Sequence, residues 1–264
     1  AGLPITPENA RRFSDLWGFE VPDQPGLTTV EMLMAAEQGA LDALYCVGGN
    51  FLETLPEPQR IERALARIPL RIHSDLFLTS QMLVEPADVV YLLPARTRYE
   101  QEGGGTETST ERRVIFSPEI PGHRVGEART EWRMALDFAR AVRPADYAKI
   151  HLADAAEVRA DIERAVPFYR GIAALTRQGD QFQWGGPRLC TERRFPTSDG
   201  RAHFQVVAPK TEPVVENGRP ERFLLATRRG KQFNSMVQAE VDSLTGAARD
   251  HVFIAAVDAA RLGL

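Results

Sequence analysis

Two glycines and an asparagine follow a short apolar run, and this pattern indicates an anion-binding loop. The run at residues 43–47 carries no charged side chain and ends in Gly48, Gly49 and Asn50. Glycine lets a backbone approach a ligand closely, and N–H groups at the start of a helix bind phosphate. Thr54, one turn later, either caps the next helix, which is the commoner use, or gives a hydroxyl to a phosphate oxygen. We expect a pyrophosphate site here.

Two further predicted strands also end in residues with a use at a ligand site. Ser74 and Asp75 follow the second strand, and Pro94 and Ala95 follow the third. The Asp75 carboxylate suits the N–H edge of a purine or a ribose hydroxyl, although an aspartate here also caps helices. Two adjacent glycines lack the spacing of the GxGxxG fingerprint, so the sequence gives no support for an NAD site.

The composition excludes several classes of function. The chain has 264 residues and a formal charge of −4, with 36 acidic residues against 32 basic ones, so it offers no basic field for nucleic acid. Cys46 and Cys190 stand far apart and form no CxxC metal motif. No apolar stretch is long enough to cross a membrane, and we expect a cytoplasmic protein without membrane contact.

Helix and strand signals alternate through the first hundred residues. A capping box of Thr28 and Glu31 opens a predicted helix that ends at Gly39, and strands are expected at 43–47, 70–73 and 88–93. Amphipathic segments between them read as helices. The alternation predicts an α/β fold with an open, mostly parallel sheet and helices on both faces. Ligands of such sheets bind beyond the carboxyl ends of the strands.

The second half changes character. Residues 96–126 read as a long loop, followed by helices from 131 and 154 that end near Pro144 and Ala165. β-Prone runs then surround Asp199 and Gly200, a strong hairpin signal. We therefore expect an α/β dinucleotide-binding domain with trailing helices at 1–178 and a smaller, truncated, β-rich and barrel-like domain at 179–264.

Four stretches, in this order, resemble the molybdopterin oxidoreductase family, most closely its formate-dehydrogenase-like branch. They are VGGNFLET, HSDLFLTSQMLVEPADVVYLLPA, the short TEW and ATRRGKQFNSMVQAEVDSLTGAARD. Each stretch alone is a weak signal, and the four in order and at plausible separations cover most of the chain. In this family, two domains clamp a molybdopterin guanine dinucleotide, and two such dinucleotides hold one molybdenum atom.

The resemblance implies that this chain supplies the second nucleotide-binding domain and the start of the C-terminal barrel. By position, Gly48, Gly49 and Asn50 would line the diphosphate with Thr54 nearby. The remaining cofactor-binding residues implied are Ser74 and Asp75 at the guanosine end, Pro94 and Ala95 as a wall, Glu131 fixing the nucleotide, and Arg228, Gln232, Phe233 and Asn234 over the pterin and phosphates.

The same resemblance implies an enzyme that moves two electrons to or from formate or a similar small substrate. The family's iron–sulfur segment and its metal-ligating cysteine, selenocysteine or serine have no counterpart in this sequence. We therefore assign no catalytic or metal-ligating residue and expect the chain alone to be inactive. Its partner would be the rest of the same polypeptide or a catalytic subunit, with an iron–sulfur cluster only if an upstream segment exists.

Two other functions stay open at this point. One is a non-catalytic nucleotide-binding or docking module, because α/β sheets of this kind serve many unrelated functions. The other is an α/β domain of a thiamine- or flavin-dependent enzyme. A native gene that extends upstream through a cysteine cluster and a metal-ligating residue would separate a molybdenum enzyme from the docking module. Metal analysis of a full-length protein, together with release of the fluorescent oxidised pterin, separates it from a thiamine or flavin enzyme.

Overall fold

The computed structural model describes residues 3–209, 223, 225–227, 239–248 and 250–264. The chain divides into two compact units, Ala1–Ala202 and His203–Leu264. The predicted domain boundary near residue 178 stays a prediction.

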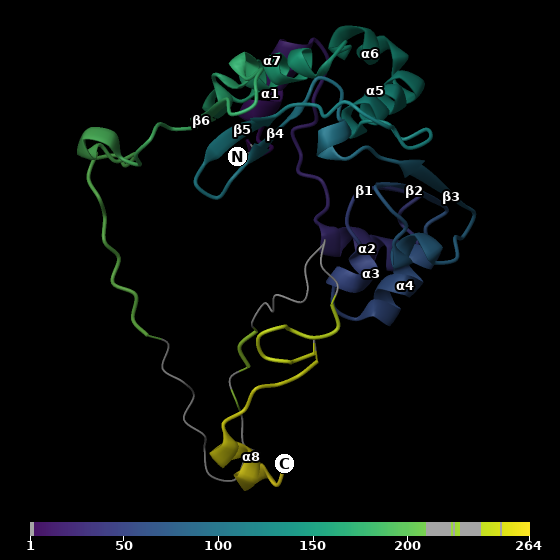
Figure 1. Cartoon of the computed structure of the whole chain (residues 1–264), viewed down its shortest axis with the longest axis vertical. Helices are drawn as coiled ribbons and strands as arrows, with labels where there is room; N and C mark the ends of the chain where they lie inside the picture. The colour runs from purple at the N-terminus through teal and green to yellow at the C-terminus, as the bar shows by residue number, and fades with distance from the viewer. Residues whose placement is uncertain (1–2, 210–222, 224, 228–238, 249) are drawn as a thin grey trace. The chain divides into compact units, whose positions relative to one another are not determined.

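A three-stranded parallel sheet forms the first part of the larger unit (Figure 1). Its strands are β1 (Ala43–Val47), β2 (Leu70–Asp75) and β3 (Val89–Pro94), in the order β1-β2-β3. All pairs are parallel, so the three carboxyl ends lie along one edge. The predicted α/β character and the parallel sheet are confirmed.

Helices contact both faces of this sheet. On one face, α2 (Thr29–Glu37) and α4 (Pro58–Ala66) enclose the main apolar core, against which Leu44 of β1 packs. Successive strand residues point to opposite faces, and Tyr45 accordingly meets α5 (Glu131–Val142), where its ring centroid lies 6.0 Å from that of Phe138. Helices therefore cover both faces of the sheet at β1, whereas Tyr91 and Leu92 of β3 stay exposed.

Local capping explains where the predicted helices begin. The Glu31 N–H donates to the Thr28 hydroxyl at 3.4 Å, and the Thr28 N–H donates to the Glu31 carboxylate at 2.7 Å, which completes the predicted capping box. Asp154 accepts two N–H bonds at the start of α7 (Ala155–Ala165). The other helices of this unit are α1 (Pro7–Trp17), α3 (Phe51–Thr54) and α6 (Pro144–Ile150), with short 3-10 turns at Ser80–Leu83, Arg98–Glu100, Pro167–Tyr169, Ile172–Ala174 and Thr191–Arg193.

A small antiparallel sheet occupies the segment that the sequence predicts as loop, and that prediction was wrong. Its strands are β4 (Gly105–Thr108), β5 (Arg113–Ser117) and β6 (Gln181–Gln183), in the order β4-β5-β6. β4 and β5 are short and contain glycine, threonine and charged residues, so they do not show the alternation of apolar and polar residues that marks a strand. Val114 and Phe116 of β5 turn inward and form a second core with Ile172 and Leu175, and Phe182 of β6 packs against it.

The described residues after β6 contain less strand structure than predicted. A turn forms around Asp199, with the Phe195 N–H donating to the Gly200 carbonyl at 3.4 Å, but the flanking residues form no strand pair. Phe204 and Val206 are almost fully exposed, so these runs bury no apolar face that would stabilise pairing. The smaller unit contains a bridge between Val241 and Ala248 and helix α8 (Ala256–Leu262). No closed barrel forms among the described residues.

Candidate functional site at the carboxyl edge of the parallel sheet

The carboxyl edge brings together most of the predicted site residues. The Gly48 N–H donates to the Ser74 carbonyl at 2.8 Å, which extends the β1–β2 ladder by one residue. Asp75 lies opposite Pro94 across the next pair, and its carbonyl accepts the Ala95 N–H at 2.9 Å. These five residues therefore form one continuous line across the three strand ends.

The loop of residues 48–50, called here the glycine loop, is open on one side. Gly48 and Gly49 have φ angles of 67° and 78°, a region that favours glycine. A methyl group built on either glycine meets no atom within 4 Å. Among the described contacts, the N–H groups of Gly49 and Asn50 have no hydrogen-bond partner, whereas that of Gly48 is used in the ladder. The loop therefore offers two amides to a ligand instead of three.

Local bonds hold the far side of the glycine loop. The Asn50 side chain donates to the Ser80 hydroxyl at 3.0 Å and accepts the Glu53 N–H at 3.4 Å. The Thr54 hydroxyl donates to the Asn50 carbonyl at 2.7 Å, one turn back along α3. Thr54 therefore has a local partner, and its nearness to a diphosphate stays a prediction.

Two carboxyl groups at the edge influence each other electrostatically. Asp75 accepts the Leu76 N–H at 2.7 Å, and Glu131 is the first residue of α5. Although Glu131 is an exposed residue, protein atoms partly desolvate its carboxyl, and this desolvation, followed by the negative charge of Asp75, raises the pKa of Glu131. The pair supplies acceptors for the N–H groups of a base, and the protonated form of Glu131 also donates.

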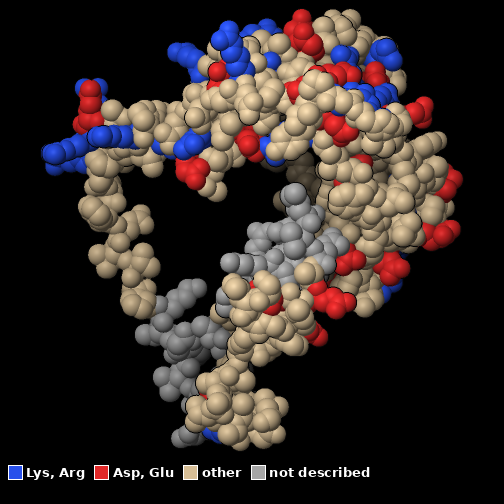
Figure 2. Space-filling view, viewed as in Figure 1, with Lys and Arg blue, Asp and Glu red and all other residues tan. Residues whose placement is uncertain are grey.

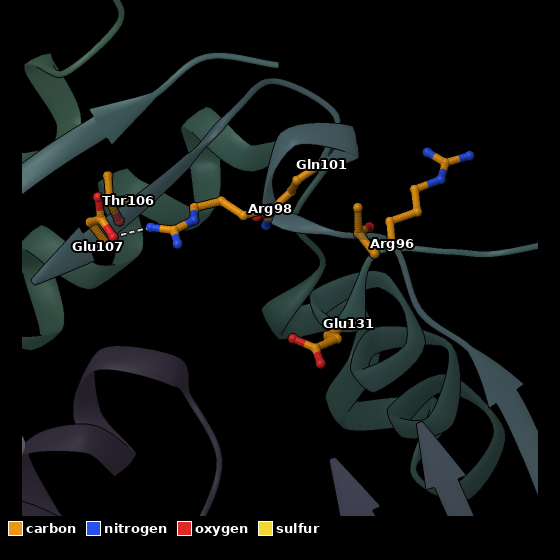
Figure 3. A pocket seen from close by; sticks show the side chains of 7 residues that line it. Arg96, Arg98, Gln101, Thr106, Glu107 and Glu131 are labelled. Atoms are coloured by element: carbon orange, nitrogen blue, oxygen red, sulfur yellow. Dashed lines mark hydrogen bonds and ion pairs between the residues drawn. The ribbon is translucent and has the colours of Figure 1, made fainter. Parts of the chain in front are cut away.

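A polar cavity of about 390 Å³ lies beyond the end of β3. It is lined by Arg96, Arg98, Gln101, Thr106, Glu107, Thr130 and Glu131 (Figure 3). Arg98 reaches to Glu107 in an ion pair, and Arg96 pairs with Glu102 outside the lining. Thr130, the N-cap of α5, is 2% exposed, and its buried hydroxyl has no hydrogen-bond partner.

Sequence reasoning missed most of this cavity. Arg98, Gln101, Thr106 and Glu107 fall in the segment expected to be loop, and only Glu131 was assigned to the site. One signal was present: Thr130 precedes an acidic residue at the start of an amphipathic helix, which marks an N-cap.

A buried polar group lies behind the edge, inside the sheet. Arg71 and His73 of β2 are fully buried, with 0% and 1% of their surfaces exposed. Burial, together with the Arg71 charge, lowers the pKa of His73 to about 4, and burial raises the pKa of the Cys46 thiol to about 11. Both groups are neutral at pH 7, so they serve the fold rather than acid–base chemistry at the edge.

On the visible face of the larger unit, acidic and basic side chains are mixed over the upper part, whereas acidic side chains predominate along the right-hand edge (Figure 2). No described helix is long and apolar enough to span a membrane, and no three described histidine, cysteine or acidic side chains gather as a metal site. The predicted residues Arg228, Gln232, Phe233 and Asn234 lie outside the described residues.

Comparison with known proteins identifies relatives of this chain. No family model matches the chain. A probable oxidoreductase, YjgC, of Bacillus subtilis is 31% identical over 238 residues, which is 81% of this chain and 22% of that protein. A putative formate dehydrogenase, YrhE, of the same organism is 28% identical over 86% of this chain and 22% of its own length. A nitrate reductase of Synechocystis is 27% identical over 81% of this chain and 33% of its own length.

These matches cover most of this chain and only a part of each relative. The chain spans between 22% and 33% of the length of the three proteins. The chain is thus a distant homologue of a portion of the molybdopterin oxidoreductases, the family of the formate dehydrogenases and nitrate reductases.

Proposed function

We propose that the chain is the cofactor-binding portion of a molybdenum-dependent oxidoreductase that acts on formate or a similar small substrate. It would bind molybdopterin guanine dinucleotide along the carboxyl edge of β1–β3. The observation that carries this proposal is the continuous line from Gly48 through Ser74 and Asp75 to Ala95, with Glu131 near enough to Asp75 for the Asp75 charge to raise its pKa.

The residues at the edge fit such a dinucleotide. The open glycine loop, with two unbonded amides, suits an anionic diphosphate. Neighbouring strands lie about 5 Å apart, so the ends of β1 and β3 are separated by roughly 10 Å. A diphosphate at β1 and a ribose near Asp75 would therefore bring the base to the cavity beyond β3. There, Glu131 would accept from the N–H edge of guanine, and Arg98 would donate to its oxygen and ring nitrogen.

Different parts of the cofactor would be held by different residues. When bound, the molybdenum of this cofactor would exchange two electrons with the substrate. The residues described here would bind and orient the nucleotide end, while Arg228, Gln232, Phe233 and Asn234, on a barrel-like domain that starts in this chain, would contact the pterin. The metal ligand, and any iron–sulfur cluster, would come from the rest of the same polypeptide or from a catalytic subunit, and this chain alone would have no turnover.

Titration of the isotope-labelled chain with GDP tests the proposal. GDP carries the base, ribose and diphosphate of the proposed ligand. We expect weak binding, roughly millimolar, because a partial site leaves much of the ligand in water. Amide chemical shifts should change at Gly49, Asn50, Ala95 and Glu131, and CDP, which has another base, should bind more weakly. GDP-induced shifts confined to other parts of the chain would contradict the proposal.

A further inference from the structure

We infer that Gln81 is a positioning residue that shapes the glycine loop for an anionic ligand. Gln81 lies in the 3-10 turn Ser80–Leu83, thirty residues after the loop in sequence. The inference rests on the proposed function, because the anion in question is the diphosphate of the dinucleotide.

The Gln81 side chain bonds to the backbone on both sides of Asn50 in the glycine loop. Its amide nitrogen donates to the Gly49 carbonyl at 2.7 Å, and its amide oxygen accepts the Phe51 N–H at 2.7 Å. Gln81 is 1% exposed, so water does not compete for either bond. One planar amide therefore fixes the peptide groups on both sides of Asn50.

The bond to Gly49 decides which way the next amide points. In a trans peptide, the carbonyl of one residue and the N–H of the following residue point in opposite directions. The Gly49 carbonyl is directed inward to the buried Gln81, so the Asn50 N–H is directed away from Gln81. The same bond removes a carbonyl oxygen, which repels anions, from the ligand side of the loop.

The turn that carries Gln81 is itself anchored in the sheet. The buried Arg71 guanidinium donates to the Gln81 carbonyl at 3.0 Å and also to the Val84 carbonyl. Ser80, the neighbour of Gln81, accepts from the Asn50 side chain and donates to Glu53 at 2.9 Å. Strand β2 therefore fixes the turn, and the turn fixes the loop.

A substitution that keeps volume and removes both bonds tests this role. Gln81→Met should increase hydrogen exchange of the Phe51 amide in the ligand-free chain by about tenfold and weaken pyrophosphate binding by at least about fivefold. Gln183→Met in β6 is the matched control. It removes a bond from a glutamine side chain to the Glu111 carbonyl and should change neither quantity. Both variants are compared with the wild type after circular dichroism shows that they are folded.

A second variant separates positioning from simple stabilisation. In Gln81→Glu, the ionised carboxylate accepts from Phe51 but repels the Gly49 carbonyl, whereas the protonated acid donates to it. Burial raises the pKa of such a glutamate. We therefore expect its pyrophosphate affinity, relative to that of the wild type at the same pH, to be several-fold lower at pH 7.5 and to recover at pH 5. Because protonation of a buried glutamate also restores stability, circular dichroism at pH 7.5 must show the variant folded, so that the affinity lost at this pH reports positioning.

The outcomes distinguish the role of Gln81 from the proposed function of the edge. Unchanged pyrophosphate affinity in Gln81→Met, or unchanged exchange at Phe51, would overturn the role of Gln81 while leaving the proposed function standing. A wild-type chain that shows no shift in the glycine loop with either pyrophosphate or GDP would contradict the proposed function, and the role of Gln81 in it.

Discussion

The two three-stranded sheets of the larger unit differ in the partners of the polar groups beside them. At the carboxyl edge of the parallel sheet, the Gly49 and Asn50 amides have no described partner, and the negative charge of Asp75 acts on the Glu131 carboxyl. In the antiparallel sheet, Arg112 donates to the Trp184 carbonyl at 2.6 Å, and Arg159 stacks 5.0 Å from the Phe116 ring centroid. The two open amides mark the first region as the binding edge, and the second region contributes Thr106 and Glu107 to the wall of the cavity beyond it.

The largest expected effect is a loss of stability on substitution of Gly104, next to the antiparallel sheet, and Gly49 of the parallel sheet's edge is the comparison. A Cβ at Gly104 would stand 2.6 Å from the Phe116 ring and 2.7 Å from the Ser117 carbonyl oxygen, on a backbone with φ of 74°. Gly104→Ala should lower the free energy of unfolding by about 4 kcal/mol through overpacking and strain. At Gly49 the added methyl group meets open space, so Gly49→Ala should cost only about 1 kcal/mol, from its φ angle.

Urea unfolding measures both losses, and GDP titration completes the comparison. Gly49→Ala should weaken GDP binding because the methyl group projects into the space that the ligand would use. Equal stability losses at the two glycines would remove the distinction between a structural and a ligand-facing position.

The next effect concerns His73, buried inside the parallel sheet. Its folded-state pKa of about 4 lies below its usual value near 6.5, so the unfolded chain binds a proton at higher pH than the folded one. The contribution is fully present above pH 6.5 and is lost as the pH falls toward 4, by about 3 kcal/mol at most. Gln in place of His73 should flatten this part of the stability–pH curve, whereas His123→Gln should leave it. Urea midpoints between pH 4 and 7.5 measure the slope, and an unchanged slope in His73→Gln would contradict the assignment.

The contrast between the sheets also explains which strands could be predicted from the sequence. β1 and β3 are short apolar runs that follow helical segments, so residues such as Leu44 and Val90 mark them by composition. In β5 only Val114 and Phe116 turn inward, and one of its two partner strands, β6, lies more than sixty residues away in sequence. No local pattern reports such a pairing.

The candidate site divides along the same line. Strand ends are visible in the sequence, and Gly48, Ser74, Asp75 and Ala95 accordingly meet as the parallel-sheet prediction requires. The cavity was not predictable, because Arg98 and Thr106 reach it only through the fold of the antiparallel segment. Gln81 was equally hidden, since its role depends on one side chain that bridges two backbone groups thirty residues away.

The smallest expected change in stability, and the sharpest test of base recognition, is at the carboxylate pair. Glu131→Gln removes a charge that Asp75 repels, so we expect a change in the free energy of unfolding within about 0.5 kcal/mol. Guanine presents a ring N–H and an amino group to a carboxylate, whereas the hypoxanthine of IDP lacks the amino group. If Glu131 accepts from both, the wild type should prefer GDP to IDP several-fold, and Glu131→Gln should lose that preference. Asp75→Asn is the matched variant: loss of the preference in Asp75→Asn alone would move base recognition from the cavity beyond β3 to the end of β2.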